Sequence, residues 1–314
     1  AISFTGSQVK MVTDGNFSEA KIRSVSTERI TSSLEQNRVV IVAGFQGIDE
    51  DENITTLGRG GSDTSAVALA VALGTRDCEI YTDVEGVYTA DPRIVQNTRK
   101  LREISYDEML ELARLGAGVL HSRSVEFSKK FNIRLTVRSS FNYEEGTVVM
   151  PKEEMVEKFL VSGVTAKTNE AKITLRDLPD RPGIASRLFG KLGESKLYVN
   201  MIVQSTGHDN MASISFTVMK KDLKGAIGIC ESLKAEIGAA DISWKEDIAI
   251  VSAVGVGMLS SYGVAGRMFR ILSDHGINIE MISTSEIGIS CVIDQKYSEL
   301  AQKIIHQEFL GEQA

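Results

Sequence analysis

A run of small residues at 58–63, Gly-Arg-Gly-Gly-Ser-Asp, is the first segment whose residue types suggest chemistry. Consecutive small residues leave backbone N–H groups accessible. The Ala/Leu/Val-rich stretch that follows predicts a helix whose N-terminal end attracts an anion such as phosphate or carboxylate. Arg59 adds a guanidinium that suits a carboxylate. A plain turn in which Ser62 or Asp63 caps the helix explains the glycine content equally well. The run is not a Walker A loop, because no Gly-Lys-Ser/Thr follows it.

A second polar segment, residues 82–93, follows a predicted strand at 78–81. Ligands of open α/β sheets bind beyond the carboxyl ends of the strands, so the position suits a site. The segment offers acidic oxygen ligands, a flat ring at Tyr88 and a cation at Arg93. Composition alone nevertheless favours a solvated acidic loop. The histidines, His121 among them, have no metal-ligand spacing and are interpreted as structural.

The elements that would position these two segments alternate between strand and helix. The pattern predicts strands at 38–45, 78–81 and 133–138, and helices at 64–73, 106–115 and 120–131. The apolar, β-branched run at 38–45 is typical of a buried parallel strand. Ser105 and Glu108 form a capping box at the start of the second helix. Residues 1–150 are therefore expected to form an α/β domain with a mostly parallel sheet.

The second half of the chain contains an internal repeat with an offset of 80 residues. Gly183–Thr206 aligns with Gly263–Glu286, and 8 of these 24 positions are identical. Each copy is expected to fold as one supersecondary unit, at 171–245 and 246–314. The second copy is one strand short, and the β-rich stretch 159–167 is unassigned. Residues 151–170 are therefore expected to comprise a linker and a strand that completes the second unit, so that the units interleave.

Polar residues follow the glycine that opens the first helix of each repeat. They are Asn200 and Gln204 in the first copy, and Asn278, Ser283, Thr284, Ser285 and Glu286 in the second. Such groups at a seam between the units could hold a small zwitterion. Ordinary capping of sheet edges is the simpler interpretation.

Composition limits the classes of partner. The 314 residues carry a net charge of −7 and are 42% apolar, as is usual for soluble proteins, which argues against binding of nucleic acid. The three cysteines are widely spaced and contain no C-x-x-C motif, so a cytoplasmic location is expected. No apolar run approaches the length of a membrane span, so no membrane partner is expected.

Several of these segments together resemble the aspartate kinase family over essentially the whole chain. They are Phe4–Gln8, Gly44–Gly47, Leu57–Asp63, Thr82–Arg93, Val137–Ser140 and Ile282–Glu286. The resemblance implies an amino acid kinase domain, a three-layer sandwich with a mostly parallel sheet. Two interleaved ferredoxin-like βαββαβ units, called ACT domains, are expected to follow it. The implied reaction transfers the γ-phosphoryl group of ATP to the side-chain carboxylate of L-aspartate, the first step towards lysine, threonine and methionine, with Mg²⁺ as the expected cation.

The resemblance also implies roles for particular residues. Arg59, Gly60, Gly61 and Ser62 would bind aspartate, and Asp63 would be the catalytic residue that orients cations. The nucleotide would contact Thr82, Asp83, Tyr88, Arg93, Gly118 and Val119. Lysine, threonine or both would bind as feedback effectors at Asp180, Ala185, Asn200, Gln204, Val264, Ala265, Asn278, Ile279, Ser285 and Glu286. Independently of the resemblance, the sheets of the repeat units have edges and faces that one chain cannot fully cover, so a homodimer or larger homo-oligomer is expected.

The chain departs from the family pattern in two places. The Lys-x-Gly-Gly strand with which the family begins is absent, which suggests that an N-terminal segment precedes residue 1 and that this chain alone is an incomplete kinase. Many members carry Lys where Gly118 stands. A glutamate or uridylate kinase is disfavoured by the tandem repeat. A non-catalytic amino-acid sensor is the remaining alternative, and the missing lysine segment favours it.

Overall fold

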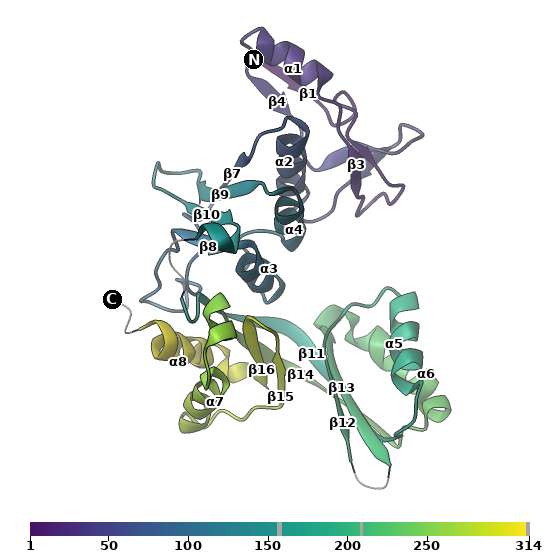
Figure 1. The fold of residues 1–314 in the computed structure, drawn as a ribbon. Helices are drawn as coiled ribbons and strands as arrows, with labels where there is room; N and C mark the ends of the chain where they lie inside the picture. Colours follow the sequence, from purple (N-terminus) through teal and green to yellow (C-terminus); the bar gives the residue numbers. More distant parts are fainter. Residues whose placement is uncertain (156–158, 208–209, 312–314) are drawn as a thin grey trace. The chain divides into compact units, whose positions relative to one another are not determined.

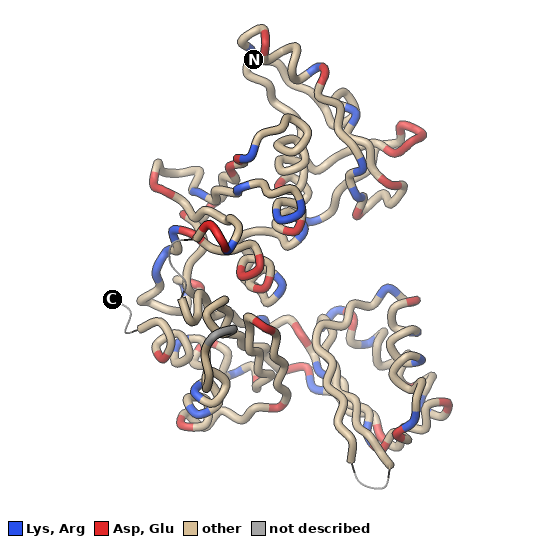
Figure 2. Tube along the Cα trace, in the orientation of Figure 1, with Lys and Arg blue, Asp and Glu red and all other residues tan. Residues whose placement is uncertain are grey.

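The computed structural model describes residues 1–155, 159–207 and 210–311. The chain divides into two compact units. The first comprises residues 1–92 and 96–163, and the second residues 93–95 and 164–314. Each unit is described by itself. In both units, Lys and Arg are interspersed along the trace with Asp and Glu (Figure 2).

Residues 1–56 of the first unit form two small sheets and one helix. The elements are β1 (Ile2–Phe4), β2 (Val12–Thr13), β3 (Ile22–Ser24), α1 (Glu28–Glu35), β4 (Val40–Val42), β5 (Gln46–Ile48) and β6 (Ile54–Thr56). β1 pairs with β4 in parallel, and the other four strands form a sheet in the order β3-β2-β5-β6.

The apolar run at 38–45 is a parallel strand, as predicted, but only one of its faces is covered. Val40 and Val42 pack against the buried cluster that contains Met11 and Leu57. Val39 and Ile41 point the other way and are 68% and 56% exposed. Since successive side chains of a strand alternate between faces, the prediction of a buried strand is wrong for the outward face.

The rest of the first unit carries the two polar segments. Its elements are α2 (Gly61–Ala72), β7 (Asp77–Thr82), β8 (Glu103–Ser105), α3 (Tyr106–Arg114), α4 (Ser122–Phe131), β9 (Arg134–Ser139) and β10 (Thr147–Met150). The sheet order is β7-β9-β10-β8, with parallel β7–β9 and β10–β8 pairs and an antiparallel β9–β10 pair. α4 packs against both α2 and α3, as Figure 1 shows. The helices and strands predicted here are confirmed within a few residues.

The capping box at α3 is present as predicted. The Glu108 amide donates to Ser105 Oγ at 3.2 Å, and the Ser105 amide donates to Glu108 Oε2 at 3.1 Å. Glu108 is fully buried, and Ser162 Oγ donates to its other carboxylate oxygen at 2.6 Å. The start of α3 is thereby tied to the end of the unit.

Over its described residues, the second unit is one six-stranded sheet with four helices. Its main elements are β11 (Gly163–Pro179), α5 (Ile184–Glu194), β12 (Val199–Thr206), β13 (Met211–Met219), α6 (Leu223–Ile237), β14 (Asp241–Val254), α7 (Val264–Asp274), β15 (Met281–Thr284), β16 (Gly288–Asp294) and α8 (Ser298–Leu310). Short 3₁₀ turns lie at Lys220–Asp222, Val256–Ser260 and Gln295–Tyr297, and a further one at Lys152–Glu154 belongs to the first unit.

The strand order β12-β13-β11-β14-β16-β15 shows that the two repeats interleave. A βαββαβ unit places its strands in the order fourth, first, third, second. The first repeat fits this order with β14 as its fourth strand, and the second repeat fits it with β11 as its fourth strand. The expected strand from the 159–167 stretch therefore exists, although it begins at Gly163. β11 and β14 run without a break through the predicted boundaries at residues 170 and 245, because each serves both repeats.

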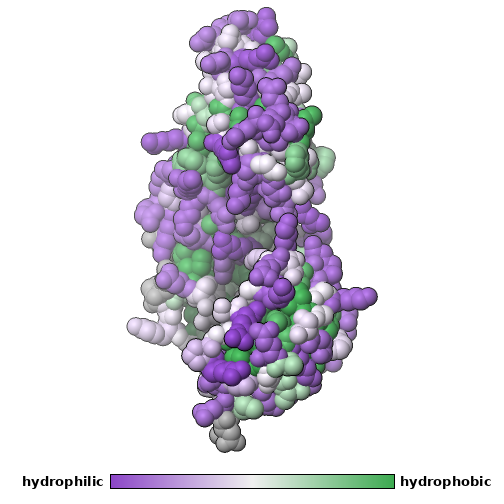
Figure 3. All heavy atoms as spheres, turned by 90° about the vertical axis from the view of Figure 1, so that its right-hand side faces the viewer, coloured by the Kyte–Doolittle hydropathy of each residue, from purple (hydrophilic) through white to green (hydrophobic). Residues whose placement is uncertain are grey.

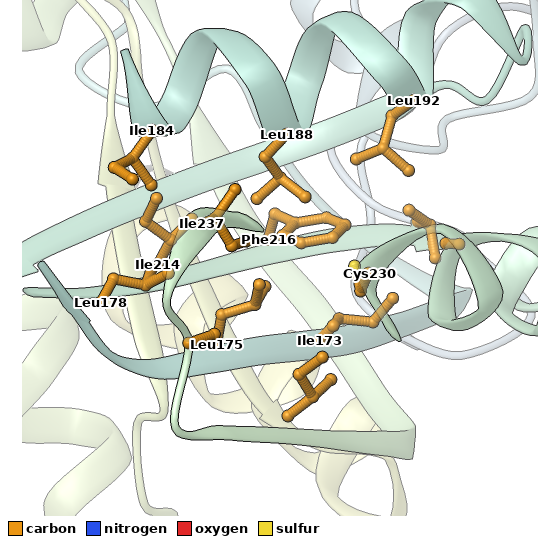
Figure 4. Packing of buried hydrophobic residues seen from close by; sticks show 14 of the residues in the cluster. Ile173, Leu175, Leu178, Ile184, Leu188, Leu192, Ile214, Phe216, Cys230 and Ile237 are labelled. Atoms are coloured by element: carbon orange, nitrogen blue, oxygen red, sulfur yellow. The ribbon is translucent and has the colours of Figure 1, made fainter. Parts of the chain in front are cut away.

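Each repeat begins its first helix after a glycine in the left-handed region. Gly183 precedes α5 with φ +100°, and Gly263 precedes α7 with φ +84°. α5 and α6 cover an aliphatic core on the sheet in which Phe216, Leu175, Leu188 and Cys230 are buried (Figure 4).

On the surface, hydrophilic residues surround smaller apolar patches (Figure 3).

Candidate active site and effector pocket

The glycine run at 58–61 forms a tight turn that leads directly into α2. Gly58 has φ +76° and Gly60, the N-cap residue of α2, has φ +64°. The Gly61 amide donates to the carbonyl of Gly58 at 3.0 Å. Two left-handed residues so close together make glycine the suitable residue at both positions.

The turn is also closely packed. A Cβ atom at Gly60 would lie 2.2 Å from Cβ of His121, the N-cap residue of α4. A Cβ atom at Gly61 would lie 2.8 Å from the ring of Phe45. The backbone of the turn therefore rests directly on the start of α4, which the sequence analysis missed. The available signal for this contact was that His121 lies two residues after Val119, one of the expected nucleotide contacts.

The first turn of α2 presents donors for an anion. Within the described part of the chain, the amides of Ser62 and Asp63 have no hydrogen-bond acceptor, as is usual for the first turn of a helix. Ser62 and Arg59 are both exposed. The turn thus combines free N–H groups, the positive end of a twelve-residue helix and a guanidinium, which together favour a carboxylate or phosphate.

Asp63 lies half-buried in the same turn. Burial raises the pKa of its carboxyl group, while the His121 ring, the Ser62 side chain and the His121 backbone amide act in the opposite direction. Burial also raises the pKa of the Cys78 thiol on β7 to about 11, and the Asp63 carboxylate adds to that shift. A partly desolvated carboxylate that lies between α2 and β7 is suited to a cation that arrives with a substrate.

The acidic loop begins where β7 ends. Thr82 Oγ1 donates to Asp83 Oδ1 at 3.0 Å, and the Tyr88 hydroxyl donates to Glu85 Oε2 at 2.9 Å. Asn142, from the loop after β9, donates to the other oxygen of Glu85 at 2.9 Å. The loop therefore starts at the carboxyl end of β7 with a bonded Thr82–Asp83 pair, and Asp83 is exposed. Tyr88 is tied to Glu85 in the same loop.

Three other predicted nucleotide contacts lie elsewhere in the chain. Gly118 and Val119 lie between α3 and α4, just before His121, and a Cβ atom at Gly118 would meet nothing within 4 Å. Arg93 is exposed and lies in segment 93–95, which groups with the second unit. Its proposed contact with the nucleotide stays a prediction.

A cavity of about 350 Å³ opens at the start of α5 in the first repeat. Three of the predicted effector residues, Asp180, Ala185 and Gln204, line it, and Asn200 does not. Sequence reasoning missed further lining residues at the helix start: Arg181, Pro182, Gly183 and Ile184. Their position next to Gly183 was the available signal.

In the second repeat, two of the predicted effector residues, Asn278 and Ile279, border a hollow. The hollow has a volume of about 390 Å³ and is also lined by Phe269, Ser273, Gly276 and Ile277. It lies at the end of α7, whereas Val264 and Ala265 lie at its start. Ser285 and Glu286 are exposed beyond β15. That all six residues line one effector site stays a prediction.

Residues 1–155, 159–207 and 210–311 contain no group of three or more His, Cys, Asp and Glu side chains suited to a metal ion. In the same ranges, no helix is both long and apolar enough to cross a bilayer. Asp63 is thus a single carboxylate beside a set of free amides. This is the donor set expected where a cation is shared with the phosphates of a substrate.

The comparisons with known proteins agree with this geometry. The amino acid kinase family model matches residues 1–139, and an ACT domain model matches residues 251–309. The aspartate kinase of Pseudomonas putida is 48% identical over 310 residues, which cover 98% of this chain and 75% of that protein.

Two solved structures have the same fold. E. coli aspartokinase III in complex with aspartate and ADP, in the R-state, superposes with a TM-score of 0.82 at 26% identity, covering 99% of this chain and 70% of that chain. The same enzyme in complex with lysine and aspartate, in the T-state, superposes with a TM-score of 0.75 at 28% identity, covering 98% and 69%.

The fold and the glycine turn together define an amino acid kinase with regulatory ACT domains. Identity of 48% over nearly the whole chain narrows the class further. The chain belongs to the aspartate kinase family.

Proposed function

We propose that this protein phosphorylates the side-chain carboxylate of L-aspartate with ATP and is feedback-regulated through its ACT domains. The turn at 58–63 carries the proposal, because it brings free helix amides, the Arg59 guanidinium and the Asp63 carboxylate to one place. Phosphoryl transfer needs little covalent help from an enzyme and depends mainly on positioning and charge stabilisation. The turn supplies both.

Each part of the turn has a distinct task. Arg59 holds a carboxylate of aspartate through charge-assisted hydrogen bonds, and the amides of Ser62 and Asp63 orient oxygen atoms by donating to them. Thr82, Asp83 and Tyr88 would contact the nucleotide at the edge of β7, and the backbone at Gly118 and Val119 would add a further contact. Asp63 would hold Mg²⁺ through an oxygen ligand, and the ion, when bound, neutralises charge on the phosphates.

A coupled assay of ATP consumption with the full-length protein tests this proposal. Aspartate-dependent ADP release is expected, and product formation is confirmed by trapping the acyl phosphate with hydroxylamine. Glutamate in place of aspartate is the control. ATP-independent binding of amino acids, with no ADP release at any aspartate concentration, would instead support the sensor.

The effector is proposed to be lysine, threonine or both, bound at the start of α5. Asp180 can accept from an ammonium group, while amides at the helix start can donate to a carboxylate. The cavity of about 350 Å³ has room for one amino acid. Equilibrium dialysis with labelled lysine and threonine measures which of the two binds.

The protein is further proposed to be a cytoplasmic homodimer or larger homo-oligomer. The sheet of the second unit ends in β12 and β15, whose residues Ile202 and Ile282 are 50% and 42% exposed. Strand edges that carry apolar side chains favour pairing with a second copy. Cys78, Cys230 and Cys291 are free thiols, which suits a reducing compartment. Sedimentation with and without lysine and threonine measures the oligomeric state.

A further inference from the structure

Arg123, in the first turn of α4, donates to two backbone carbonyls that lie far away in sequence. Nη1 donates to the carbonyl of Leu57 at 2.7 Å, and Nη2 donates to the carbonyl of Ala20 at 2.5 Å. Across the described ranges, no carboxylate forms an ion pair with this guanidinium. The Arg123 guanidinium thus bonds to backbone oxygens, and these bonds hold the backbone at Leu57 and Ala20 in place.

Both carbonyls belong to the frame of the glycine turn. Leu57 directly precedes Gly58. Ala20 ends the segment 17–20, which lies along the approach to the turn. In this segment the Ala20 amide donates to the carbonyl of Thr56 at 2.9 Å, and the Thr56 amide donates to the carbonyl of Phe17 at 2.9 Å. A Cβ atom at Gly58 would lie 3.1 Å from the carbonyl oxygen of Ser18.

The same turn of α4 also supports the far end of the glycine run. His121 packs on Gly60, and its ring accepts from the Arg123 amide at 3.4 Å. Arg123 therefore holds the entrance of the turn, while His121 supports its exit. The turn is fixed at both ends by one helix start, and Gly118 and Val119 lead into that helix start.

We propose that Arg123 is a positioning residue for the phosphoryl-acceptor site. This inference rests on the proposed function, since it names what orients the groups that bind aspartate. The guanidinium holds the backbone of residues 57–63 so that the amides of Ser62 and Asp63 and the side chain of Arg59 converge on the substrate. A shift of about 1 Å in such groups is sufficient to slow a reaction on the order of 100-fold.

The test compares Arg123→Ala, Arg123→Lys and a matched control, Arg114→Ala. Arg114 donates to Glu126 of α4 at 2.8 Å in an exposed ion pair, so the control also removes a guanidinium contact to α4 without touching the turn. Arg123→Ala is expected to lower kcat/KM for aspartate about 10- to 100-fold. The KM for ATP should change less than about threefold, and the control should match wild type. Arg123→Lys keeps one donor group and should recover part of the loss.

Hydrogen exchange provides a measurement that does not depend on activity. Amides in peptides spanning 56–64 and 15–21 should exchange faster in Arg123→Ala than in wild type, while peptides across β7 and β9 should not change. Unchanged exchange of these peptides in both Arg123 variants would overturn the proposal even if the wild-type protein phosphorylated no aspartate. Equal loss of apparent affinity for aspartate and ATP in Arg123→Lys would also overturn it, since that result indicates general destabilisation. Absence of wild-type activity together with faster exchange would reject the proposed function and leave the role of Arg123 in fixing the turn standing.

Discussion

Lys172 and Glu280 form an ion pair in which Nζ lies 2.5 Å from Oε2. The two residues are 108 positions apart in sequence, and their side chains are only 19% and 16% exposed. The other oxygen of Glu280 accepts from Lys245 of β14 at 2.6 Å. Glu280 therefore ties the two strands that both repeats share to the segment that carries Asn278 and leads into β15.

Glu280→Gln is expected to destabilise the second unit at neutral pH by about 1–3 kcal/mol, because two lysines lose a charged acceptor. Burial alone would raise the pKa of Glu280, but hydrogen bonds and charge from Lys172 and Lys245 outweigh it and hold the pKa below the usual 4.5. A lowered carboxylate pKa contributes stability above pH 4.5, and this contribution is lost as the pH falls through the folded-state pKa. The stability difference between wild type and variant should therefore shrink below pH 4.5. Urea unfolding at pH 7 and pH 4 measures it, and an undiminished difference at pH 4 would show that the carboxylate charge is not its cause.

Gly60→Ala is expected to destabilise the first unit and abolish activity. The left-handed conformation alone costs a non-glycine residue about 1–2 kcal/mol, and the added Cβ atom would lie 2.2 Å from His121. Gly118→Ala is the matched control, because its Cβ atom would meet nothing within 4 Å. Thermal unfolding of both variants is the measurement. Equal unfolding temperatures would contradict the close packing of the turn on α4.

Asp63→Asn is expected to separate stability from activity. Burial raises the pKa of this carboxyl group, which means that the ionised side chain has a higher free energy in the folded protein than in the unfolded chain. The neutral amide should therefore leave the stability unchanged or increase it. Loss of a charge that holds the catalytic cation should lower kcat on the order of 100-fold. The pH dependence of the stability difference is the diagnostic measurement. Wild type should gain relative to Asp63→Asn as the pH falls through the folded-state pKa, and a gain in the opposite direction would exclude desolvation as the main effect.

The predictability of the site differed between its parts for physical reasons. The capping box at Ser105, the helix behind the glycine run and the shared strand β11 were all predicted, because each depends on local pattern or on counting strands in a repeat. The contacts from His121 and Arg123 were not predicted. They join residues dozens of positions apart through packing and through backbone carbonyls. Every residue has a backbone carbonyl, so the residue types do not indicate which one a side chain will contact.

The exposure of the outer face of β4 also could not be predicted from the local sequence pattern. An apolar, β-branched run predicts a strand, but it does not state which neighbours cover each face. Similarly, the repeat pattern aligns Val264 with Ile184 and Asn278 with Tyr198, but it does not state which residues of a repeat line one cavity.

Arg59→Ala is expected to raise the KM for aspartate and to lower kcat/KM on the order of 10- to 100-fold, which corresponds to the loss of a charge-assisted hydrogen bond worth about 1.5–3 kcal/mol. Arg59 is exposed, so the substitution should leave the unfolding temperature unchanged. Initial rates at varied aspartate and ATP concentrations test this, with Arg114→Ala as the control for loss of an exposed arginine. Unchanged aspartate kinetics would remove Arg59 from the substrate site.

Substitutions at Gln204 and Ser285 are expected to relieve feedback inhibition without lowering the uninhibited kcat. Gln204 lines the cavity at the start of α5 together with Asp180 and Ala185, and its amide can donate to or accept from an amino acid there. Inhibition requires tighter binding of the effector to the less active state, typically by about 1–3 kcal/mol of coupling. Loss of one hydrogen bond of about 1 kcal/mol to the effector should therefore shift half-maximal inhibition to several-fold higher concentration.

Titration of activity with lysine and threonine is the measurement for Gln204→Ala and Ser285→Ala. Ser205→Ala is the matched control, since Ser205 is the next residue of β12 and does not line the cavity. A shift for Gln204→Ala but not for Ser285→Ala would assign the effector to the α5 cavity alone. Inhibition curves identical to wild type in both variants would reject the assignment of the effector residues. A wild-type enzyme that responds to neither amino acid would reject feedback regulation by lysine and threonine, while the kinase activity would stand on its own assay.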